Sequence, residues 1–249
     1  GETPAYGAAQ HGHEGCLRLL KEAGCDIGQA GNNGRTPAHL AAAHGHMTCL
    51  QILKEAGYDI GQADNFGETP AHSAAAYGQL GCLGLLKEVG CDLGQAANDG
   101  ITPLYVAVAF DHEACLRFLL QEHGCDLEQE NDDGLTPAHT AATHGYESSL
   151  RLLKEAGFVL DKPDKDGYTA SHMAAMKGHE DCLRVLKESG CDLSHVDYYE
   201  GITPAHKAAM NGHVNCLKFL QEIGCDLQIV DNSGCTPAHW AGIRGHTDC

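Results

Sequence analysis

The sequence predicts an all-α repeat solenoid, built from helix-turn-helix units that stack side by side. The first observation is a Thr-Pro pair that returns every 33 or 34 residues through the 249-residue chain. The second is a glycine at fixed places within each period, and the third is a recurring pair of alanines. A period in this range is typical of stacked supersecondary units. The pair occurs at Thr3-Pro4, Thr36-Pro37, Thr69-Pro70, Thr102-Pro103, Thr136-Pro137, Thr203-Pro204 and Thr236-Pro237, and Thr169-Ala170 keeps the place without the proline.

Each unit opens with a short first helix. Thr36 is a good N-cap residue, and Pro37 suits the first helical position because the missing N–H needs no partner there. Gly45 ends this helix, since glycine adopts the left-handed conformation most easily. The alanine pair, Ala41-Ala42 in this unit, lets first helices of neighbouring units pack closely.

The second helix and a turn complete the unit. His46 begins the helix, in which Cys49, Ile52 and Leu53 recur on one apolar face, and Gly57 ends it. The chain then returns through an extended segment to a turn that carries glycine before the next Thr-Pro. Such turns suit a tight β-hairpin, so each unit is predicted to carry a hairpin finger.

These repeated motifs resemble those of the ankyrin-repeat family, whose repeat unit contains Thr-Pro-Leu-His, an alanine pair, Gly-His and Gly-Ala-Asp. Here Thr-Pro-Ala-His stands at 36–39, 69–72, 136–139, 203–206 and 236–239, and Gly-Cys-Asp at 24–26, 90–92, 124–126, 190–192 and 224–226. The resemblance implies a curved superhelical stack with a concave protein-binding face. It also implies a structural role for the motif histidine, His39 in the second unit. We expect a single array over 1–249, with incomplete end units and approximate boundaries at 1–31, 32–64, 65–97, 98–131, 132–164, 165–198, 199–231 and 232–249.

Charge narrows the classes of partner. The formal net charge is −18, with 34 acidic and 16 basic residues. This balance repels nucleic acid and anionic lipid, so the predicted partner is another protein, one with a basic patch. The longest nearly apolar stretch, Ile101 to Phe110, is about half the length of a membrane helix, so no direct membrane insertion is expected.

The thirteen cysteines are expected to be free thiols. A chain of this length with no charged-then-apolar leader does not fit a small disulfide-rich secreted protein. The cysteines of successive Gly-Cys-Asp motifs also lie one repeat apart, which is too far for a disulfide between them. We therefore expect a cytoplasmic, reducing compartment.

Pairs with His-x-x-Cys spacing raise the question of metal binding or catalysis. They occur at His13/Cys16, His46/Cys49, His112/Cys115, His179/Cys182, His213/Cys216 and His246/Cys249. Zinc needs four ligands, whereas each unit offers two and the next pair lies about 10 Å away. Repeated pairs also lack the single distinctive constellation of a catalytic site. We expect no metal, no cofactor and no enzymatic activity, with Thr36, Pro37, His39, Gly45, Cys49 and Gly57 in structural roles.

Partner-binding residues are expected where the units differ from one another, at the fingertips and at the exposed ends of first helices. Exposed aromatic side chains are good binding anchors; the alternative is that fingertip aromatics pack only on the next finger. The candidates are Phe66, Glu68, Tyr77, Asp99, Ile101, Phe110, Asp132, Leu135, His144, Tyr168, Lys177, Tyr198, Tyr199, Ile202 and Trp240.

Two irregular places suggest where a ligand lies. The fourth unit has no glycine after its first helix and one extra residue between Cys115 and Gly124, which a π-bulge could absorb. The other insertion enlarges the finger at Tyr198-Tyr199-Glu200. We expect one protein ligand to cross units three to seven and to contact both places.

A different class of function stays open. Neither end of the chain reads as a polar capping repeat, which solenoids need for solubility. The alternative is therefore a structural spacer, or a rod that stacks end to end within a larger assembly. Deletion of a fingertip cluster should abolish recognition but leave assembly largely intact.

Overall fold

The computed structural model describes residues 3–121 and 129–249, and within them fifteen helices form successive pairs. The chain divides into two compact units, 1–126 and 127–249, each described by itself. We call these unit 1 and unit 2, and we use "repeat" for each helix pair with its finger. The predicted all-helical repeat solenoid is confirmed.

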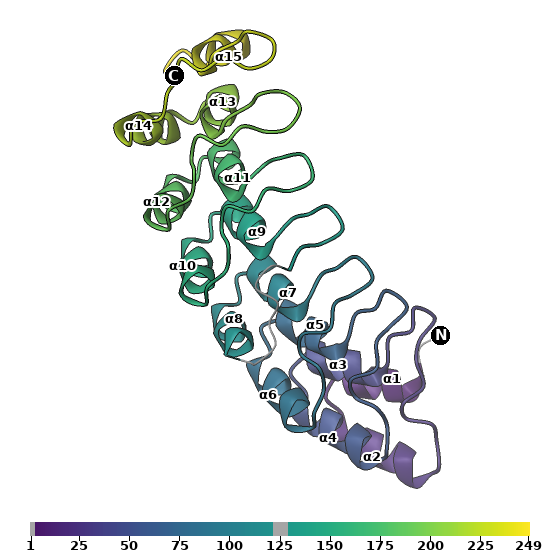
Figure 1. Cartoon of the computed structure of the whole chain (residues 1–249). Coiled ribbons are helices and arrows are strands. Elements are labelled where there is room, and N and C mark those ends of the chain that lie inside the picture. The colour runs from purple at the N-terminus through teal and green to yellow at the C-terminus, as the bar shows by residue number, and fades with distance from the viewer. Residues whose placement is uncertain (1–2, 122–128) are drawn as a thin grey trace. The chain divides into compact units, whose positions relative to one another are not determined.

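Unit 1 contains four helix pairs. The first helices α1, α3, α5 and α7 pack side by side, and α2, α4, α6 and α8 form a second row against them (Figure 1). Each helix contacts its counterpart in the adjacent pair. The bounds are α1 Pro4–Gln10, α2 Glu14–Glu22, α3 Pro37–Ala43, α4 Met47–Glu55, α5 Pro70–Ala76, α6 Leu80–Glu88, α7 Pro103–Ala109 and α8 Glu113–Leu120.

Unit 2 repeats the same arrangement with three pairs and one further first helix. First helices α9, α11, α13 and α15 pack in one row, and second helices α10, α12 and α14 in the other. The bounds are α9 Pro137–His144, α10 Glu147–Glu155, α11 Ala170–Lys177, α12 Glu180–Glu188, α13 Pro204–Met210, α14 Val214–Glu222 and α15 Pro237–Arg244.

The first helices form as their sequence predicts. Thr36 has the extended conformation of an N-cap residue, Pro37 follows at the first helical position, and His39 completes a capping box. Ala41 and Ala42 are fully buried between α1, α3 and α5. A larger side chain there would separate the helices, because protein interiors are already close-packed.

The second helices supply the larger apolar side chains of the core. Cys49, Ile52 and Leu53 are each 1% exposed on the face of α4 that meets α3 and the neighbouring second helices. Helix α4 ends at Glu55, and Gly57 follows with a φ of 88°. The predicted apolar face and the predicted glycine stop are therefore confirmed.

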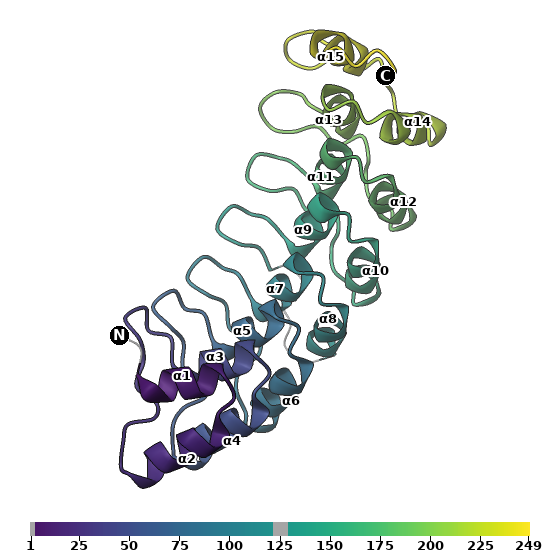
Figure 2. The same cartoon turned by 180° about the vertical axis from the view of Figure 1, so that it is seen from behind.

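Narrow fingers project from the first-helix row of each unit (Figure 2). One is closed by a hydrogen bond from the Asp64 N–H to the Glu68 carbonyl, 2.8 Å, and Gly67 supplies a φ of 80° at its turn. Successive fingers are joined by a main-chain bond, such as that from the Asn98 N–H to the Phe66 carbonyl, 2.9 Å, and by a side-chain bond, such as that from Asn98 Nδ2 to the Asn65 carbonyl, 3.2 Å. The fingers are hairpins with too few ladder bonds for a strand to be assigned among the described residues.

The fourth repeat departs from the others at two places. Where the other first helices are followed by glycine, Asp111 takes a φ of 55°, the one positive φ of a non-glycine among the described residues. Helix α8 is a regular α-helix from Glu113 to Leu120. The extra residue expected near Gly124 lies in 122–128, outside the described residues, so the π-bulge stays a prediction.

Candidate functional site

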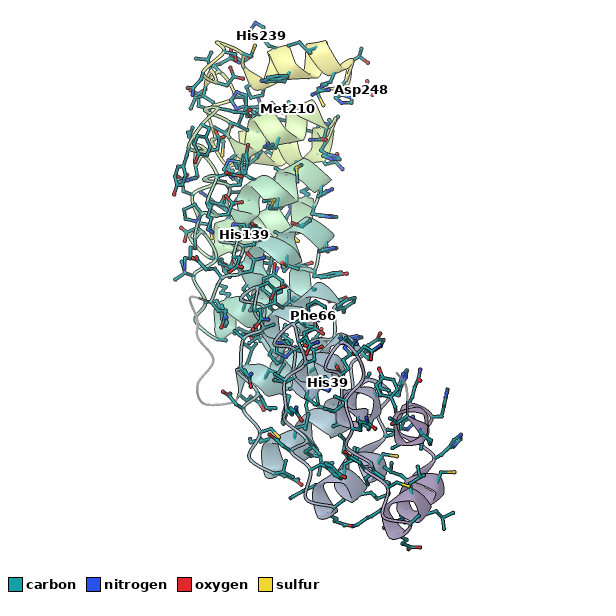
Figure 3. All side chains as sticks on the ribbon, turned by 90° about the vertical axis from the view of Figure 1, so that its right-hand side faces the viewer. His39, Phe66, His139, Met210, His239 and Asp248 are labelled. Atoms are coloured by element: carbon teal, nitrogen blue, oxygen red, sulfur yellow. The ribbon has the colours of Figure 1, made fainter. Side chains whose placement is uncertain are left out.

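The motif histidines join neighbouring repeats as well as capping their own helix. The ring of His39 (Figure 3) accepts a hydrogen bond at Nδ1 from the Thr36 N–H, 3.1 Å, and donates from Nε2 to the Glu68 carbonyl of the next finger, 2.9 Å. These contacts require the neutral ring, and burial lowers the pKa of His39. Equivalent bonds run from His72 to Ile101, His139 to Tyr168, His172 to Ile202 and His206 to Cys235.

The local half of this role is the one that the family resemblance implies, and the capping boxes confirm it. The half that reaches the next finger was missed. No signal within a single repeat reveals it, because the acceptor is a main-chain carbonyl whose residue type changes from Glu68 to Ile101 to Tyr168.

In the His46/Cys49 pair, the two side chains have separate structural roles. His46 donates from Nε2 to the Gln10 carbonyl, 3.1 Å. Its ring lies so close to Gly12 that a Cβ there would be 2.6 Å from Nδ1. Cys49 is buried beneath the helix pair. The described residues contain no group of three or more potential ligands that could hold a metal ion.

The pKa values of the buried thiols are shifted in the direction opposite to that of a nucleophilic cysteine. Burial raises the pKa of Cys82 to about 11 and that of Cys182 to about 12. A catalytic cysteine needs a lowered pKa, because the thiolate is the nucleophile. These cysteines behave as small core residues.

We call the surface that the fingers and first helices of each unit share the inner face. In unit 1 it holds a groove with a volume of about 320 Å³. Fingers form one wall, and α5 and α7 form the floor and the far rim. The groove is lined by Arg35, Glu68, His72, Ser73, Ala76, Tyr77, Ile101, Tyr105, Val106, Ala109 and Phe110.

The charges on the finger wall of this groove are largely paired. The Arg35 guanidinium donates from Nε to the Asp64 carboxylate, 3.3 Å, and also pairs with Glu68. Asp64 is buried and accepts at Oδ1 from the N–H groups of Phe66 and Glu68, at 2.8 and 3.0 Å. This network fixes the finger that borders the groove.

The inner face of unit 2 holds a second groove, of about 380 Å³. The finger enlarged by insertion forms one wall, and α13 and α15 form the other side. Helix α13 ends here at Met210, labelled in Figure 3. The groove is lined by Tyr199, Glu200, Ile202, Met210, Asp231, Asn232, Ser233, Trp240 and Arg244.

The aromatic candidates fall into two groups. Five are more than half exposed: Phe66 62%, Tyr77 58%, Phe110 59%, Tyr198 57% and Tyr199 67%. These retain the exposure that a binding anchor needs.

The other two aromatic candidates have partners within the chain. Burial raises the pKa of Tyr168 to about 12, and the Lys207 ammonium lies 4.2 Å from the centre of its ring. Trp240 donates from Nε1 to the buried Asp231 carboxylate, 2.7 Å. Tyr168 and Trp240 therefore pack within the array, as the alternative interpretation of the fingertip aromatics predicts.

The remaining candidates also differ in exposure. Asp99, Asp132, His144 and Lys177 are exposed, whereas Glu68, Ile101 and Leu135 are half-buried. The expected exposure of Ile202 is wrong, because its side chain is only 1% exposed. Its N–H donates to Asp197 Oδ1 at 2.6 Å, the same finger bond that Leu135 and Tyr168 make at the equivalent position.

Several groove residues were missed by the sequence analysis. They occupy two positions of the first helix, directly after the motif histidine and three residues further on. At the first position, Ser73 and Val106 line the groove of unit 1, and Trp240, which was already a candidate, lines that of unit 2; at the second position, Ala76, Ala109 and Met210 line the grooves. The first of these varies between repeats as strongly as the chosen positions, so the same criterion could have found it.

Comparisons with known proteins agree with this architecture. A family model described as "Ankyrin repeats (3 copies)" matches residues 1–64 and 47–131. A second, "Ankyrin repeats (many copies)", matches 138–186 and 171–221. No curated protein sequence matches the chain significantly.

Solved structures of the same kind are similar to the chain. The human ASB11 ankyrin repeat domain has a TM-score of 0.74 at 27% identity, over 83% of this chain and 92% of that one. The ankyrin repeat domain of Bcl-3, a member of the IkappaB protein family, has a TM-score of 0.72 at 26% identity, over 89% and 99%.

Proposed function

Because the chain belongs to the ankyrin-repeat family, whose domains generally mediate protein–protein interactions, we propose that it is a non-catalytic scaffold for another protein. The partner binds to the inner face, which consists of the fingers and the exposed side of the first helices. The supporting observation is the set of five exposed aromatic side chains, Phe66, Tyr77, Phe110, Tyr198 and Tyr199, on or beside that face.

The exposure of these aromatics supports binding because the fold has no evident need for it. A fully exposed tyrosine or phenylalanine contributes little to stability, whereas aromatic anchors contribute strongly to interfaces. Tyr168 and Trp240 show how an aromatic is placed when it serves the array itself, half-buried and hydrogen-bonded or stacked.

The partner surface is proposed to be basic. The formal net charge of −18 favours association with a positively charged protein and disfavours nucleic acid. Exposed carboxylates on the fingers, among them Asp99 and Asp132, place part of that charge on the inner face. Binding should therefore weaken as salt concentration rises.

The test compares proteins captured by three forms of the full chain. The first is the wild type, and the second carries Tyr198→Ala with Tyr199→Ala on the inner face. The third, a control, carries Glu155→Ala with Lys187→Ala on the exposed outer sides of α10 and α12. We expect the tyrosine variant to lose a specific partner that the wild type and the control retain, as quantified by mass spectrometry. Equal capture by all three forms would refute binding at these tyrosines.

The structural alternative predicts a different result. A spacer or an end-to-end rod would self-associate, and its association would not depend on fingertip aromatics. Sedimentation over a range of protein concentrations separates the two functions. Concentration-dependent growth into long species by both the wild type and the tyrosine variant would favour the rod.

We also propose that the protein works in a reducing, cytoplasmic compartment. The support is that every cysteine among the described residues is a free thiol. Six of them are buried, five of these on second helices, where they replace ordinary apolar residues. Localisation of a fluorescent fusion of the full-length polypeptide tests this, and an oxidising compartment would contradict it.

A further inference from the structure

We propose that the groove of unit 1 binds a peptide segment of the partner in which a large apolar side chain stands next to lysine or arginine. This inference rests on the proposed function, because it assumes a protein ligand. It goes further in naming the chemistry of the bound segment and the groove that receives it.

The floor and far rim of the groove are apolar. Val106, Ala76 and Ala109 form the floor from α5 and α7, and each is only partly exposed. Tyr77 and Phe110, at the C-terminal ends of these helices, stand more than half exposed at the rim. The volume of about 320 Å³ lies at the lower end of the range for ligand pockets. It suits one or two large side chains of an extended or helical segment.

The apolar surface continues beyond the rim along the starts of the second helices. Met47 and Leu80 begin α4 and α6, and each is 41% exposed. The Met47 sulfur reaches Gly81, where an added Cβ would lie 2.7 Å from it, so the two helix starts share one surface. Four of the six exposed large apolar residues described in unit 1 therefore gather at this edge.

The surroundings of the groove are acidic. Its one cationic side chain among the lining residues, Arg35, is already paired with Asp64 and Glu68. Asp99, on the finger that bears Ile101, and Asp111, next to Phe110, are both exposed. A cation beside the bound apolar side chain would therefore pair with Asp99 or Asp111. It would not have to displace Arg35 from its ion pairs with Asp64 and Glu68.

Asp111 carries particular weight because its backbone is strained. The other seven repeats have glycine at this position, with φ between 67° and 80° in all of them. Asp111 adopts a φ of 55° although a side chain is unfavourable in that region. The fourth repeat thus bears a carboxylate next to the rim residue Phe110 at a cost in backbone energy.

The inner face of unit 2 differs from that of unit 1 in the charge of its first helices. Its first helices bear Lys177, Lys207 and Arg244 at the outward positions, whereas the described first helices of unit 1 have no lysine or arginine there. A segment rich in lysine or arginine is therefore matched by unit 1 and repelled by these groups in unit 2. This contrast supplies internal controls for the experiment.

The experiment uses three fluorescein-labelled peptides with the full chain, in low and in physiological salt. All have a glycine–serine frame. The first has tryptophan-leucine between two pairs of lysines, the second has the same apolar pair between glutamates, and the third has two alanines between lysines. We expect the first to bind at least about tenfold more tightly than the other two, since both the apolar anchor and the charge contribute.

Variants locate the binding and separate its two components. Tyr77→Ala with Phe110→Ala removes the exposed rim and should weaken the first peptide about tenfold or more. Asp99→Asn with Asp111→Asn preserves the size of both side chains and removes charge. This pair should bring the lysine and glutamate peptides closer in affinity. Val159→Ala, which removes an exposed apolar side chain of unit 2 outside both grooves, is the control and should change nothing.

A photo-crosslinking version gives a readout that does not depend on affinity. With benzoylphenylalanine in place of tryptophan, the crosslinks should fall on residues 76–77 and 106–110. Crosslinks elsewhere, equal affinity for lysine and glutamate peptides, absence of binding, or no effect of the rim variant would each overturn the inference. If a protein partner is nevertheless captured in a manner that depends on Tyr198 and Tyr199, the proposed function stands without it. If the peptide binds as expected but partner capture does not depend on Tyr198 and Tyr199, only the proposed role of these two tyrosines fails.

Discussion

At the scale of single residues, Asp111 is the clearest point of local strain. The equivalent Gly178 has a φ of 80° and touches the His213 ring so closely that a Cβ there would be 2.6 Å from Nδ1. Glycine tolerates this backbone region, but aspartate pays for it. Asp111→Gly should therefore stabilise the protein by about 0.5–1 kcal/mol, after allowance for the greater freedom of glycine in the unfolded chain.

The matched control for this prediction is Gly178→Asp. It introduces the same strain and a clash with His213, so it should lower stability by more than the first change raises it. Urea midpoints of both variants against the wild type provide the measurement. An unchanged or lower midpoint for Asp111→Gly would show that the Asp111 side chain makes a compensating contact.

The motif histidines make stability depend on pH. Burial lowers the pKa of His172 from 6.5 to about 4, so the folded state binds fewer protons than the unfolded state between these values. Stability is present above pH 6.5 and is lost as the pH falls towards 4. At about 1.36 kcal/mol per pH unit, this one ring accounts for a loss on the order of 3 kcal/mol over the whole interval.

His172→Gln isolates this contribution. The variant will be less stable at pH 7, but its urea midpoint should fall less steeply between pH 6.5 and 5 than that of the wild type, by up to one proton in the linkage slope. That interval avoids most carboxylate titration. Parallel slopes for the two proteins would mean that folding does not lower the pKa of His172.

At the scale of elements, most fingers have an aspartate or asparagine whose side chain caps the turn. Asp164 is buried, and its Oδ1 accepts the N–H groups of Asp166 and Tyr168 at 3.0 and 2.8 Å. Asn131 makes the same two bonds in the preceding finger. Asp164→Asn should therefore be nearly neutral, whereas Asp164→Ala leaves the N–H groups unpaired and should cost about 1–3 kcal/mol.

Hydrogen exchange is the appropriate measurement, because the loss should be local. In Asp164→Ala, amide exchange should accelerate at residues 164–168 and little in α10 or α12. Uniform acceleration through unit 2 would instead indicate that the finger is essential to the whole stack. The Asn variant serves as the control that keeps the cap.

The sequence was sufficient for those parts of the element that depend on local rules. Thr36, Pro37 and Gly57 mark helix ends through capping and backbone preferences, and the period of Cys49 and Ile52 marks the buried face. These rules act within a few residues, so one repeat contains all the necessary information.

The parts that could not be predicted depend on contacts between repeats. The bond from His39 to the Glu68 carbonyl involves no side-chain identity on the acceptor side. The burial of Ile202 also differs from the half-burial of Ile101 and Leu135 at the same finger position, and nothing in the sequence of the finger itself marks the difference. Neither the half-burial of Trp240 nor its bond to Asp231 can be derived from the variation of residue type between repeats. Such variation shows that a position is not fixed by the repeat pattern, but it does not show that the side chain is exposed.

At the scale of the whole molecule, the array uses cysteine where stacked helices need a small apolar side chain. Cys82, Cys182 and Cys216 occupy the same core position in different repeats, and burial raises the pKa of Cys216, as of the other two, to about 11–12. Protonated, buried thiols react slowly with disulfide reagents, since the thiolate is the reactive form. Exposed Cys16, Cys25 and Cys249 have no such protection.

Thiol titration without reductant tests both the free state of the cysteines and the packing. The native protein should show a fast phase from the exposed thiols and a slow phase from the six buried ones, limited by opening of the helical stack. After denaturation, all thirteen cysteines of the sequence should react, including Cys125, which lies outside the described residues. A stable deficit of two or more thiols would reveal disulfides and contradict a reducing compartment. A single fast phase in the native protein would instead show that the helix pairs open readily, because a buried thiol cannot react faster than its cover moves away.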